Sequence, residues 1–265
     1  MADRPPKQTP PPYVPGHDLL KGKTVLMTAA AGAGIGFATA QRCAEEGARL
    51  FISDIHEKRT AEAAKKLAEF SAEPVGYRLC NVRDDDDVRS LVAAAIEEMG
   101  RVDVVINNAG LGGETPVVEM TDDQWTSVLD ITLNSAFRMT RAVLPHMIER
   151  KSGVIVNNAS VLGWRAQKGQ AHYAAAKAGV MALTRCSALE AAEHGIRINA
   201  VSPSIAIHPF LVKTTPRELI DELEAKEAFG RGAAPWEVAN VIVFLASDYS
   251  SYMTGEVVSV SSQRS

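Results

Sequence analysis

Tyr173 and Lys177 are the residues of this sequence whose types and spacing point most directly to chemistry. They stand four positions apart in the run from Gln170 to Gly179. On a helix, side chains four positions apart share one face, about 5–6 Å apart at Cβ. Because a nearby ammonium ion favours a phenolate, we expect Lys177 to lower the pKa of Tyr173 from about 10 toward neutral pH. Such a tyrosine exchanges a proton with an alcohol or carbonyl oxygen.

A pair of this kind also arises by chance on an alanine-rich helix, but a glycine-rich turn near the start of the sequence supports the chemical interpretation. An apolar run at 24–28 precedes Gly32, Gly34, Ile35 and Gly36, and a helical pattern follows. Glycines let the backbone approach a pyrophosphate, and a helix N-terminus offers free N–H groups and partial positive charge. Glycine also marks ordinary turns, yet its place between strand and helix is the one that dinucleotide binding requires.

Asp54 favours NAD as the dinucleotide. It lies 18 residues after Gly36, at the end of the second predicted strand. A carboxylate there accepts hydrogen bonds from the ribose hydroxyls and repels a 2′-phosphate, so NADP is less favoured. The alternative for Asp54 is a turn cap. Arg59 weakens the preference for NAD, because a nearby arginine can receive a phosphate.

Composition and charge exclude several classes of function. The net charge of −4 and pI near 5.9 give no basic surface, so we expect no nucleic-acid partner. No apolar run approaches about 18 residues, so we expect no membrane span, and the start of the sequence lacks an apolar signal segment. The three cysteines are widely spaced, which suggests neither disulfides nor zinc. The aspartates at 84–87 are explained by a helix N-terminus, which favours negative charge, rather than by a metal site. We therefore expect no bound metal, and we expect a cytoplasmic protein.

Apolar runs alternate with amphipathic stretches from residue 21 to residue 265, which predicts one α/β domain. Six of the thirteen prolines lie within residues 1–20, so that segment is expected to be an extended or disordered arm. Strands spaced by helices form a doubly wound parallel sheet, here of about seven strands flanked by helices. The predicted strands are 24–28, 49–53, 75–80, 102–107, 153–158, 197–201 and 256–260, and the predicted helices 36–46, 58–70, 84–99, 122–149, the Tyr173 helix and 235–247.

The motifs occur in the order of one known family. The glycine turn is followed by Asn107–Gly110, by Ser160 placed 13 residues before Tyr173, by the Tyr173–Lys177 pair, and by Arg197–Pro203. In this combination the sequence resembles the short-chain dehydrogenase/reductase family from about residue 21 onward. The resemblance implies a single Rossmann-type domain, usually in a homotetramer, with the active site at the carboxyl ends of the strands.

A narrower resemblance suggests the substrate. Thr115–Trp125, Asn157–Lys177 and Ala191–Ser204 are similar to an actinobacterial subgroup that acts on acyl-CoA esters left after steroid rings A and B are degraded. Members of that subgroup interconvert a hydroxyl and a ketone on the indane-type remnant of rings C and D. The resemblance therefore implies an NAD(P)-dependent oxidoreductase with a small-molecule acyl-CoA substrate.

The family resemblance also assigns roles to individual residues. It implies that Tyr173 transfers the proton, that Lys177 lowers its pKa and holds the nicotinamide ribose, and that Ser160 binds the substrate oxygen. Asn81 follows the third strand, where an amide can meet the adenine and where a plain turn is the alternative. The remaining cofactor contacts implied by the family are Val82, Asn107, Asn108, Ala109, Gly110, Pro203 and Ile205.

The sequence departs from the family pattern at several positions, including ones that serve the proton relay and the lid. Thr132 stands where the family has an asparagine that holds a relay water, and its hydroxyl could take that role, whereas Asn134 should lie on another helix face. The glycine turn carries one extra residue, with alanine directly after Thr28. His208 replaces a common threonine, and residues 260–263 replace a common Val-Asp-Gly-Gly ending.

Residues 204–230 are expected to form a mobile lid over the substrate. Trp164, Phe210 and Leu211 could line an apolar pocket or simply pack, and Arg165, Lys168, Lys213 and Arg217 could meet CoA phosphates or remain solvated. Two other functions stay open. One is a 3-oxoacyl-thioester reductase of the fatty-acid type, and the other is a nucleotide-binding regulator that has lost turnover.

Overall fold

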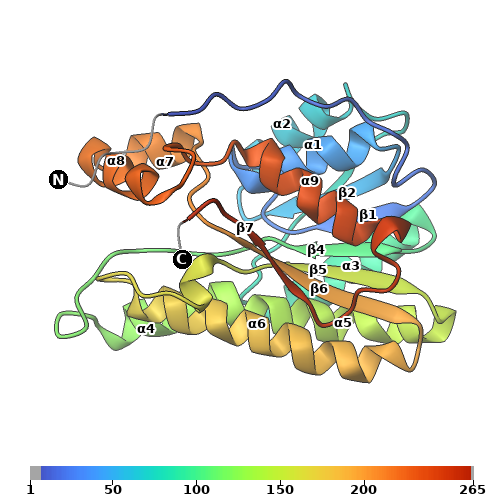
Figure 1. Cartoon of the computed structure of the whole chain (residues 1–265). Helices are drawn as coiled ribbons and strands as arrows, with labels where there is room; N and C mark the ends of the chain where they lie inside the picture. The colour runs from blue at the N-terminus through green and yellow to red at the C-terminus, as the bar shows by residue number, and fades with distance from the viewer. Residues whose placement is uncertain (1–6, 264–265) are drawn as a thin grey trace.

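One parallel sheet organises the molecule. The computed structural model describes residues 7–263, apart from the side chains at positions 210 and 214. Seven strands lie in the order β3-β2-β1-β4-β5-β6-β7, and every pair is parallel (Figure 1). The predicted doubly wound α/β sheet is therefore confirmed. The strands are β1 (Thr24–Met27), β2 (Arg49–Asp54), β3 (Gly76–Leu79), β4 (Val104–Asn107), β5 (Gly153–Asn158), β6 (Ile196–Pro203) and β7 (Val257–Val260).

Helices bury both faces of this sheet, which is why its central strands are apolar throughout. All four residues of β1 and of β4 are buried. The upper helices in Figure 1 contribute to one apolar cluster, and most of the lower helices contribute to another. The upper layer holds α1 (Ile35–Glu45), α2 (Glu57–Leu67) and α9 (Pro235–Ala246), and the lower layer α3 (Asp85–Met99), α4 (Asp122–Leu129), α5 (Ser135–Arg150) and α6 (Ala171–Ala192).

The helix predicted over 122–149 is divided by a π-helical turn. Helix α4 ends at Leu129, the turn η1 covers Asp130–Asn134, and α5 continues to Arg150. Short 3-10 turns, η2 (Val161–Gly163) and η3 (Asp248–Ser250), follow β5 and α9. The predicted cap at Asp84 is confirmed, since its carboxylate accepts from the N–H groups of Asp86 and Asp87.

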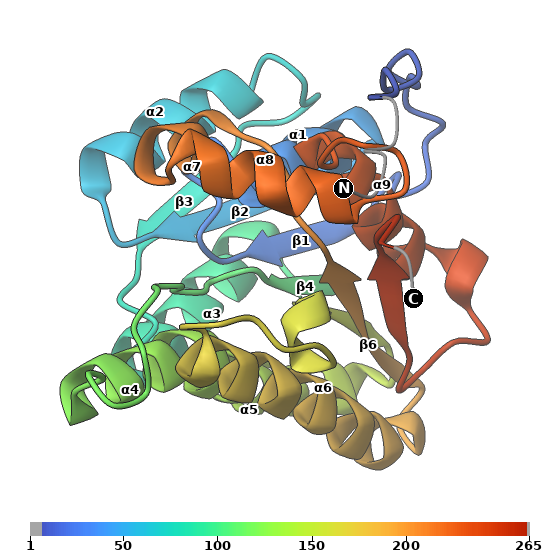
Figure 2. The same ribbon diagram turned by 60° about the vertical axis from the view of Figure 1, so that its left-hand side comes forward.

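Two short helices, α7 (Pro209–Thr214) and α8 (Arg217–Lys226), stand outside the sheet layers, within the segment expected to be a lid (Figure 2). The chain leaves and rejoins the body at one point. There Ile207 donates its N–H to the Ala233 oxygen at 2.9 Å, and Ala233 donates to the Ile205 oxygen at 2.9 Å. We use "lid" below for residues 208–232.

The arm, residues 7–17, is extended and runs from α8 across α9 to α1 (Figures 1 and 2). The Tyr13 ring meets the Trp236 ring edge-on, with centroids 5.4 Å apart. Buried Glu46 accepts the N–H groups of His17 at 2.8 Å and Leu19 at 3.0 Å, while Arg42 pairs with Glu46. In residues 7–263, no helix combines the length and apolarity needed to cross a bilayer.

Candidate active site

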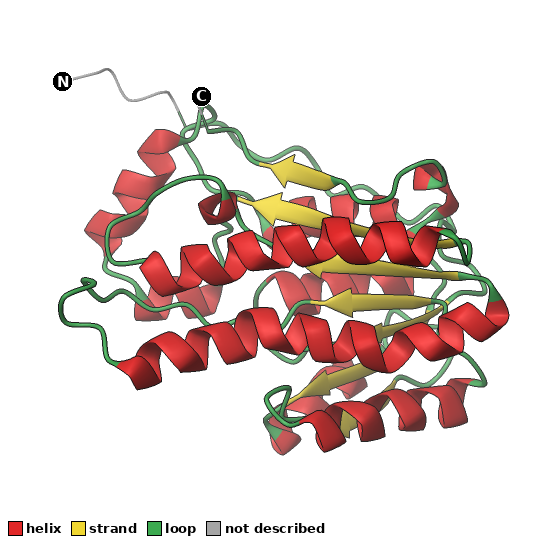
Figure 3. Ribbon diagram, turned by 90° about the horizontal axis from the view of Figure 1, so that it is seen from below, coloured by secondary structure: helices red, strands yellow, loops and turns green. Residues whose placement is uncertain are grey.

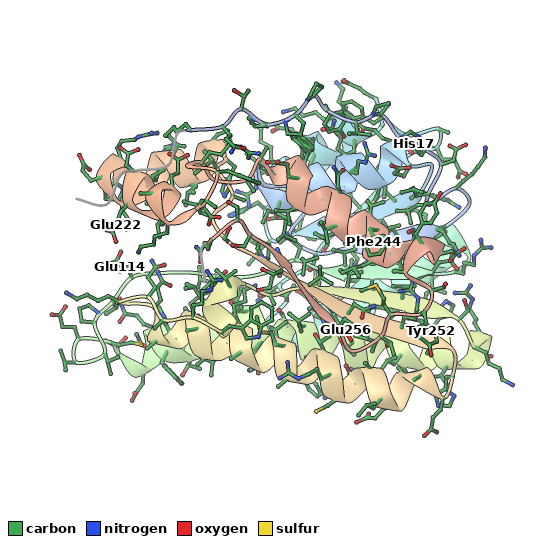
Figure 4. All side chains as sticks on the ribbon, in the orientation of Figure 1. His17, Glu114, Glu222, Phe244, Tyr252 and Glu256 are labelled. Carbon is green, nitrogen blue, oxygen red and sulfur yellow. The ribbon has the colours of Figure 1, made fainter. Side chains whose placement is uncertain are left out.

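The carboxyl ends of β1, β4, β5 and β6 meet at one end of the molecule, where the yellow arrowheads of Figure 3 point. The turn after β1, the loop after β4 and the segments after β5 and β6 all leave the sheet there. In open α/β sheets this edge is where ligands bind. Glu114 of the β4–α4 loop and Glu222 of α8 mark the same end in Figure 4.

The turn after β1 contains a strained alanine. Ala29 has φ +52°, in the left-handed region that favours glycine. It therefore occupies the place of the glycine missing after Thr28. A Cβ on Gly36 would lie 2.3 Å from the Ala29 oxygen and 2.6 Å from Asn108 Nδ2, so only glycine fits there. A Cβ on Gly32 would meet no atom within 4 Å.

A cleft of about 680 Å³ opens over this turn. It is lined by seven of the predicted cofactor residues: Gly32, Gly34, Ile35, Gly36, Asp54, Asn108 and Gly110. Asn158, His208, Arg59 and Lys66 also line it. Of these, Arg59 was expected near a phosphate, and His208 stands where the family has a threonine that touches the pyrophosphate. Lys66 of α2 belongs to no motif that would have marked it in the sequence.

Asp54 and Arg59 form an ion pair in the cleft. The buried Asp54 carboxylate accepts from Arg59 at 2.9 Å and from its neighbour, the His56 N–H, at 3.3 Å. Asp54 thus caps the turn through the His56 N–H and also lines the cleft, so the two alternatives for this residue do not exclude each other. The cleft holds one group suited to ribose hydroxyls and one suited to phosphate.

Ser160, Tyr173 and Lys177 are brought together beside the cleft. Tyr173 and Lys177 lie near the start of α6, with Lys177 Nζ 5.5 Å from the centroid of the Tyr173 ring. Ser160, two residues after the end of β5, lies close enough to Tyr173 to lower the pKa of that phenol, and its hydroxyl accepts the Leu162 N–H at 3.2 Å. Lys177 Nζ donates to the Asn158 oxygen, and Gly110 faces it, with a Cβ there 3.5 Å from Nζ.

The expected lowering of the Tyr173 pKa by Lys177 is wrong for this arrangement. Burial raises the pKa of Tyr173 to about 12, although part of this side chain still reaches solvent, and the Ser160 hydrogen bond opposes that rise. Burial also lowers the pKa of Lys177 to about 7. Desolvation disfavours both charged forms, and the ammonium bonds a backbone carbonyl rather than the phenol oxygen.

Thr132 lies inside the π-helical turn and is 1% exposed. Its hydroxyl accepts the Leu111 N–H at 3.0 Å and donates to the Leu111 oxygen at 3.2 Å, so it fixes the loop after β4. Asn134 instead bonds Asp130 at 3.1 Å on the exposed side, as expected. Turns of this kind are frequent at functional sites, because the extra residue redirects a side chain.

A buried chain of amides supports the site from beneath. Asn107 donates to Asn157 at 2.8 Å, and Asn157 donates to the Thr184 hydroxyl at 2.8 Å. Next to it, Asn158 donates to Asn108 at 2.9 Å. Sequence reasoning missed the roles of Asn157 and Asn158, although two polar residues ending an apolar strand were a usable signal.

The other predicted contacts surround the cleft without lining it. The Asn81 oxygen accepts the Arg83 N–H at 3.2 Å, which describes a turn, and Val82 packs against the α3–α5 core. Ala109 donates to Thr28 at 3.2 Å. Pro203 ends β6, and the Ile205 oxygen is bonded by Ala233.

On the substrate side, most of the predicted residues are exposed. Trp164 is 52% exposed, Leu211 is half-buried, and the side chain of Phe210 lies outside the described part. Arg165 bonds Gln263, and Arg217 bonds Asp221 at 2.8 Å. Lys168 and Lys213 are exposed.

Known proteins share this sequence and fold. Residues 29–262 match the family described as Enoyl-(Acyl carrier protein) reductase. A Mycobacterium tuberculosis protein named (5R,7aS)-5-hydroxy-7a-methyl-1-oxo-2,3,5,6,7,7a-hexahydro-1H-indene-carboxyl-CoA reductase is 61% identical, covering 96% of this chain and 97% of that protein. A 3-oxoacyl-acyl-carrier-protein reductase of Thermotoga maritima is 39% identical, over 91% of this chain and 97% of its own. A crystal structure of a short chain dehydrogenase from Mycobacterium smegmatis superposes with TM-score 0.86 at 57% identity, over 96% and 98% of the two chains.

Proposed function

Since the chain belongs to the short-chain dehydrogenase/reductase family, whose members are oxidoreductases that use NAD(P), we propose that it interconverts a ring ketone and a secondary alcohol on a steroid-derived, indane-type acyl-CoA. The observation that carries the chemistry is the convergence of Ser160, Tyr173 and Lys177 beside the glycine-lined cleft. The substrate class rests on the relative that is 61% identical and is named for such a compound.

The cleft fits a dinucleotide. A side chain at Gly36 would collide with the backbone of the turn at Ala29. Glycine at this position therefore lets the helix start pack directly against the turn beneath the cleft. Asn158 lines the cleft, and its Oδ1 is buried without a hydrogen-bond partner among the described residues. A buried acceptor of this kind suits a donor on a bound ligand. Asp54 would hold the ribose, and the N-terminus of α1 would face the pyrophosphate.

Tyr173 is the proton donor in this proposal. With a pKa of about 12, its phenol is protonated at neutral pH, which suits it to act as an acid toward a ketone oxygen. When bound in this cleft, the reduced dinucleotide would supply a hydride for the carbonyl carbon. Tyr173 then gives its proton to the oxygen, and the Ser160 hydroxyl stabilises the charge that develops there.

We propose NAD over NADP, because Asp54 is buried in the cleft and Arg59 is already engaged by it. A fluorescence titration with NADH and NADPH tests this, with Asp54→Asn as the variant. We expect tighter binding of NADH in the parent chain and a loss of that preference in the variant. Tighter NADPH binding by the parent chain would contradict the assignment.

The subunit count and location are proposals too. Large apolar side chains of α4 and α5 remain partly exposed, including Trp125 (40%) and Phe137 (44%), and such surfaces are suited to the homotetramer common in this family. All three cysteines are free, as in a cytoplasmic protein. Light scattering behind a sizing column measures the mass, and a monomer would contradict the tetramer.

A substrate screen with a matched variant tests the function. The parent chain should oxidise NADH in the presence of an indane-type oxoacyl-CoA, whereas Tyr173→Phe should lose turnover and still bind NADH. Acetoacetyl-CoA serves as the second substrate. Faster turnover of acetoacetyl-CoA would favour the 3-oxoacyl-thioester reductase instead, and retained turnover in Tyr173→Phe would remove Tyr173 as the acid.

A further inference from the structure

The lid returns to the body through Glu227–Phe229, and two remote parts of the chain hold this return segment. One is the start of the arm, Lys7–Gln8, and the other is the tail, Ser261–Gln263. Figures 1 and 2 agree that both lie next to α8. We propose that the arm and the tail act together as a clamp on the return segment, which sets how readily the lid opens to admit substrate. This inference rests on the proposed function, in which the lid covers the substrate.

The tail grips Glu227 through a buried carboxylate. Glu227 is 2% exposed, and its Oε2 accepts from the Ser262 N–H at 2.9 Å and the Ser262 hydroxyl at 2.8 Å. Ala228 donates its N–H back to the Ser262 oxygen at 2.6 Å, and Glu227 and Gln263 form an antiparallel bridge. Because a buried carboxylate is costly without hydrogen bonds, these contacts tie the tail to the lid.

The arm grips the next residues from the other side. Gln8 donates its N–H to the Phe229 oxygen at 2.9 Å, and Lys7 pairs with Glu224 of α8. Glu224 is largely buried and also accepts the Gly232 N–H at 3.3 Å, so this ion pair joins the arm to both α8 and the end of the lid. The arm is anchored farther along by Tyr13 on Trp236 and by Arg42, which donates to the Val14 oxygen.

The remaining ion pairs of α8 do not hold the lid to the body. Arg217 pairs with Asp221 and Glu224, and Lys226 pairs with Glu222, all within the same helix. At the base, the bonds between Ile205, Ile207 and Ala233 close the excursion like a hinge. Lid motion about this base must therefore strain or break the contacts that the arm and tail make beyond it.

The contacts of the arm and the tail with the lid are few, and those of the arm reach solvent. Lys7 is 59% exposed at its side chain, and Gln8 is exposed. Each hydrogen bond contributes on the order of 1 kcal/mol net, so its loss should shift a local opening equilibrium by roughly two- to ten-fold. Local opening of this size changes lid dynamics without unfolding the sheet.

Gln8→Pro tests the arm by deleting one N–H. Proline suits an extended arm that already carries Pro10, Pro11 and Pro12, and Thr9→Pro is the matched control, since the Thr9 N–H makes no hydrogen bond among the described residues. Ser262→Ala tests the tail by removing the hydroxyl that bonds Glu227. Hydrogen exchange of the α8 amides is the readout, with the amides of β4 and β5 as the check that the sheet is intact.

We expect roughly two- to ten-fold faster exchange in α8 for Gln8→Pro and for Ser262→Ala, a larger effect in the double variant, and none for Thr9→Pro. Unchanged α8 exchange in the double variant, or equal acceleration by Thr9→Pro, would overturn the clamp. This readout needs no substrate, so its failure leaves the proposed reaction untouched. If turnover of the indane-type acyl-CoA is found, the double variant should also change KM by at least two-fold, and an unchanged KM would show that the clamp does not govern substrate admission.

Discussion

Replacing Lys177 by methionine should stabilise the protein while ending its catalysis. Burial lowers the pKa of Lys177 from 10.5 to about 7, whereas the unfolded chain keeps the ordinary value. At about 1.36 kcal/mol per pH unit, the difference corresponds to roughly 4 kcal/mol lost on folding at pH 7. The variant also leaves the Asn158 oxygen without its donor, which costs about 1 kcal/mol. We therefore expect the free energy of unfolding to rise by about 3 kcal/mol at pH 7.

The sign of the pH dependence follows from the same pKa. Above about pH 7 folded Lys177 is neutral while the unfolded lysine still holds its proton up to about 10, so unfolding takes up a proton in this window. The stability of the parent protein should therefore increase by roughly 2 kcal/mol between pH 7 and pH 9 relative to Lys177→Met. Cys43 and Cys80, whose pKa values burial raises to about 12 in the folded chain, are shared by the parent protein and the variant, so their contribution cancels from the difference between the two.

Urea unfolding at pH 7, 8 and 9 measures this difference, with Lys177→Arg as a control that retains a charge. Arginine stays protonated, so we expect it to destabilise the fold at all three pH values. Parallel stability curves for the parent protein and Lys177→Met, or a less stable methionine variant at pH 7, would refute the reasoning. Either result would mean that Lys177 keeps its charge in the folded chain.

Three further outcomes follow from the turn after β1 and from the π-helical turn. Ala29→Gly relieves a left-handed alanine and should raise the free energy of unfolding by up to about 1 kcal/mol; an unchanged or lower urea midpoint would contradict the strain. Gly36→Ala forces a Cβ to 2.3 Å from the Ala29 oxygen, so calorimetry should show that the free energy of unfolding falls by roughly 1–3 kcal/mol. NADH titration should show weaker binding. Values equal to those of the parent protein would show that the turn adjusts to the extra atom. Thr132→Ala frees Leu111 and should reduce kcat about ten-fold, more than Asn134→Ala does, and the reverse ranking in steady-state rates would mean that the side chain at 134 serves the site.

The sheet was readable from the sequence because its signals are local and redundant. Buried apolar runs such as Val104–Asn107 alternate with helical patterns, and right-handed crossovers leave few ways to arrange them. The 5.5 Å approach of Lys177 to the Tyr173 ring also followed from spacing on one helix. Boundaries were less exact: β6 extends through Pro203, because it pairs with β5 on one side and β7 on the other.

Features that depend on the surroundings of a residue were not readable. The sign of the Tyr173 pKa shift was wrong, because the spacing of two residues says nothing of how deeply the fold buries them. The left-handed backbone of Ala29 was not expected, since alanine rarely adopts it, although Ala29 stands where the family pattern has a glycine. The contact of Glu227 with Ser262 joins positions 35 residues apart, and no sequence motif predicts it.

Two backbone hydrogen bonds between Ile205, Ile207 and Ala233 join the two ends of residues 208–232, so this segment can be exchanged as a unit. Because both ends of the segment meet at one place, a change in its length leaves the strand pairing of the sheet unaltered. Doubling the length of a loop costs only about 0.6 kcal/mol of closure entropy. Relatives with other substrates can therefore differ here while sharing the hydride-transfer scaffold. A graft made between residues 207 and 233 should transfer substrate preference without disturbing the sheet, provided that the graft keeps the contacts of Glu227 and Phe229 with the tail and the arm.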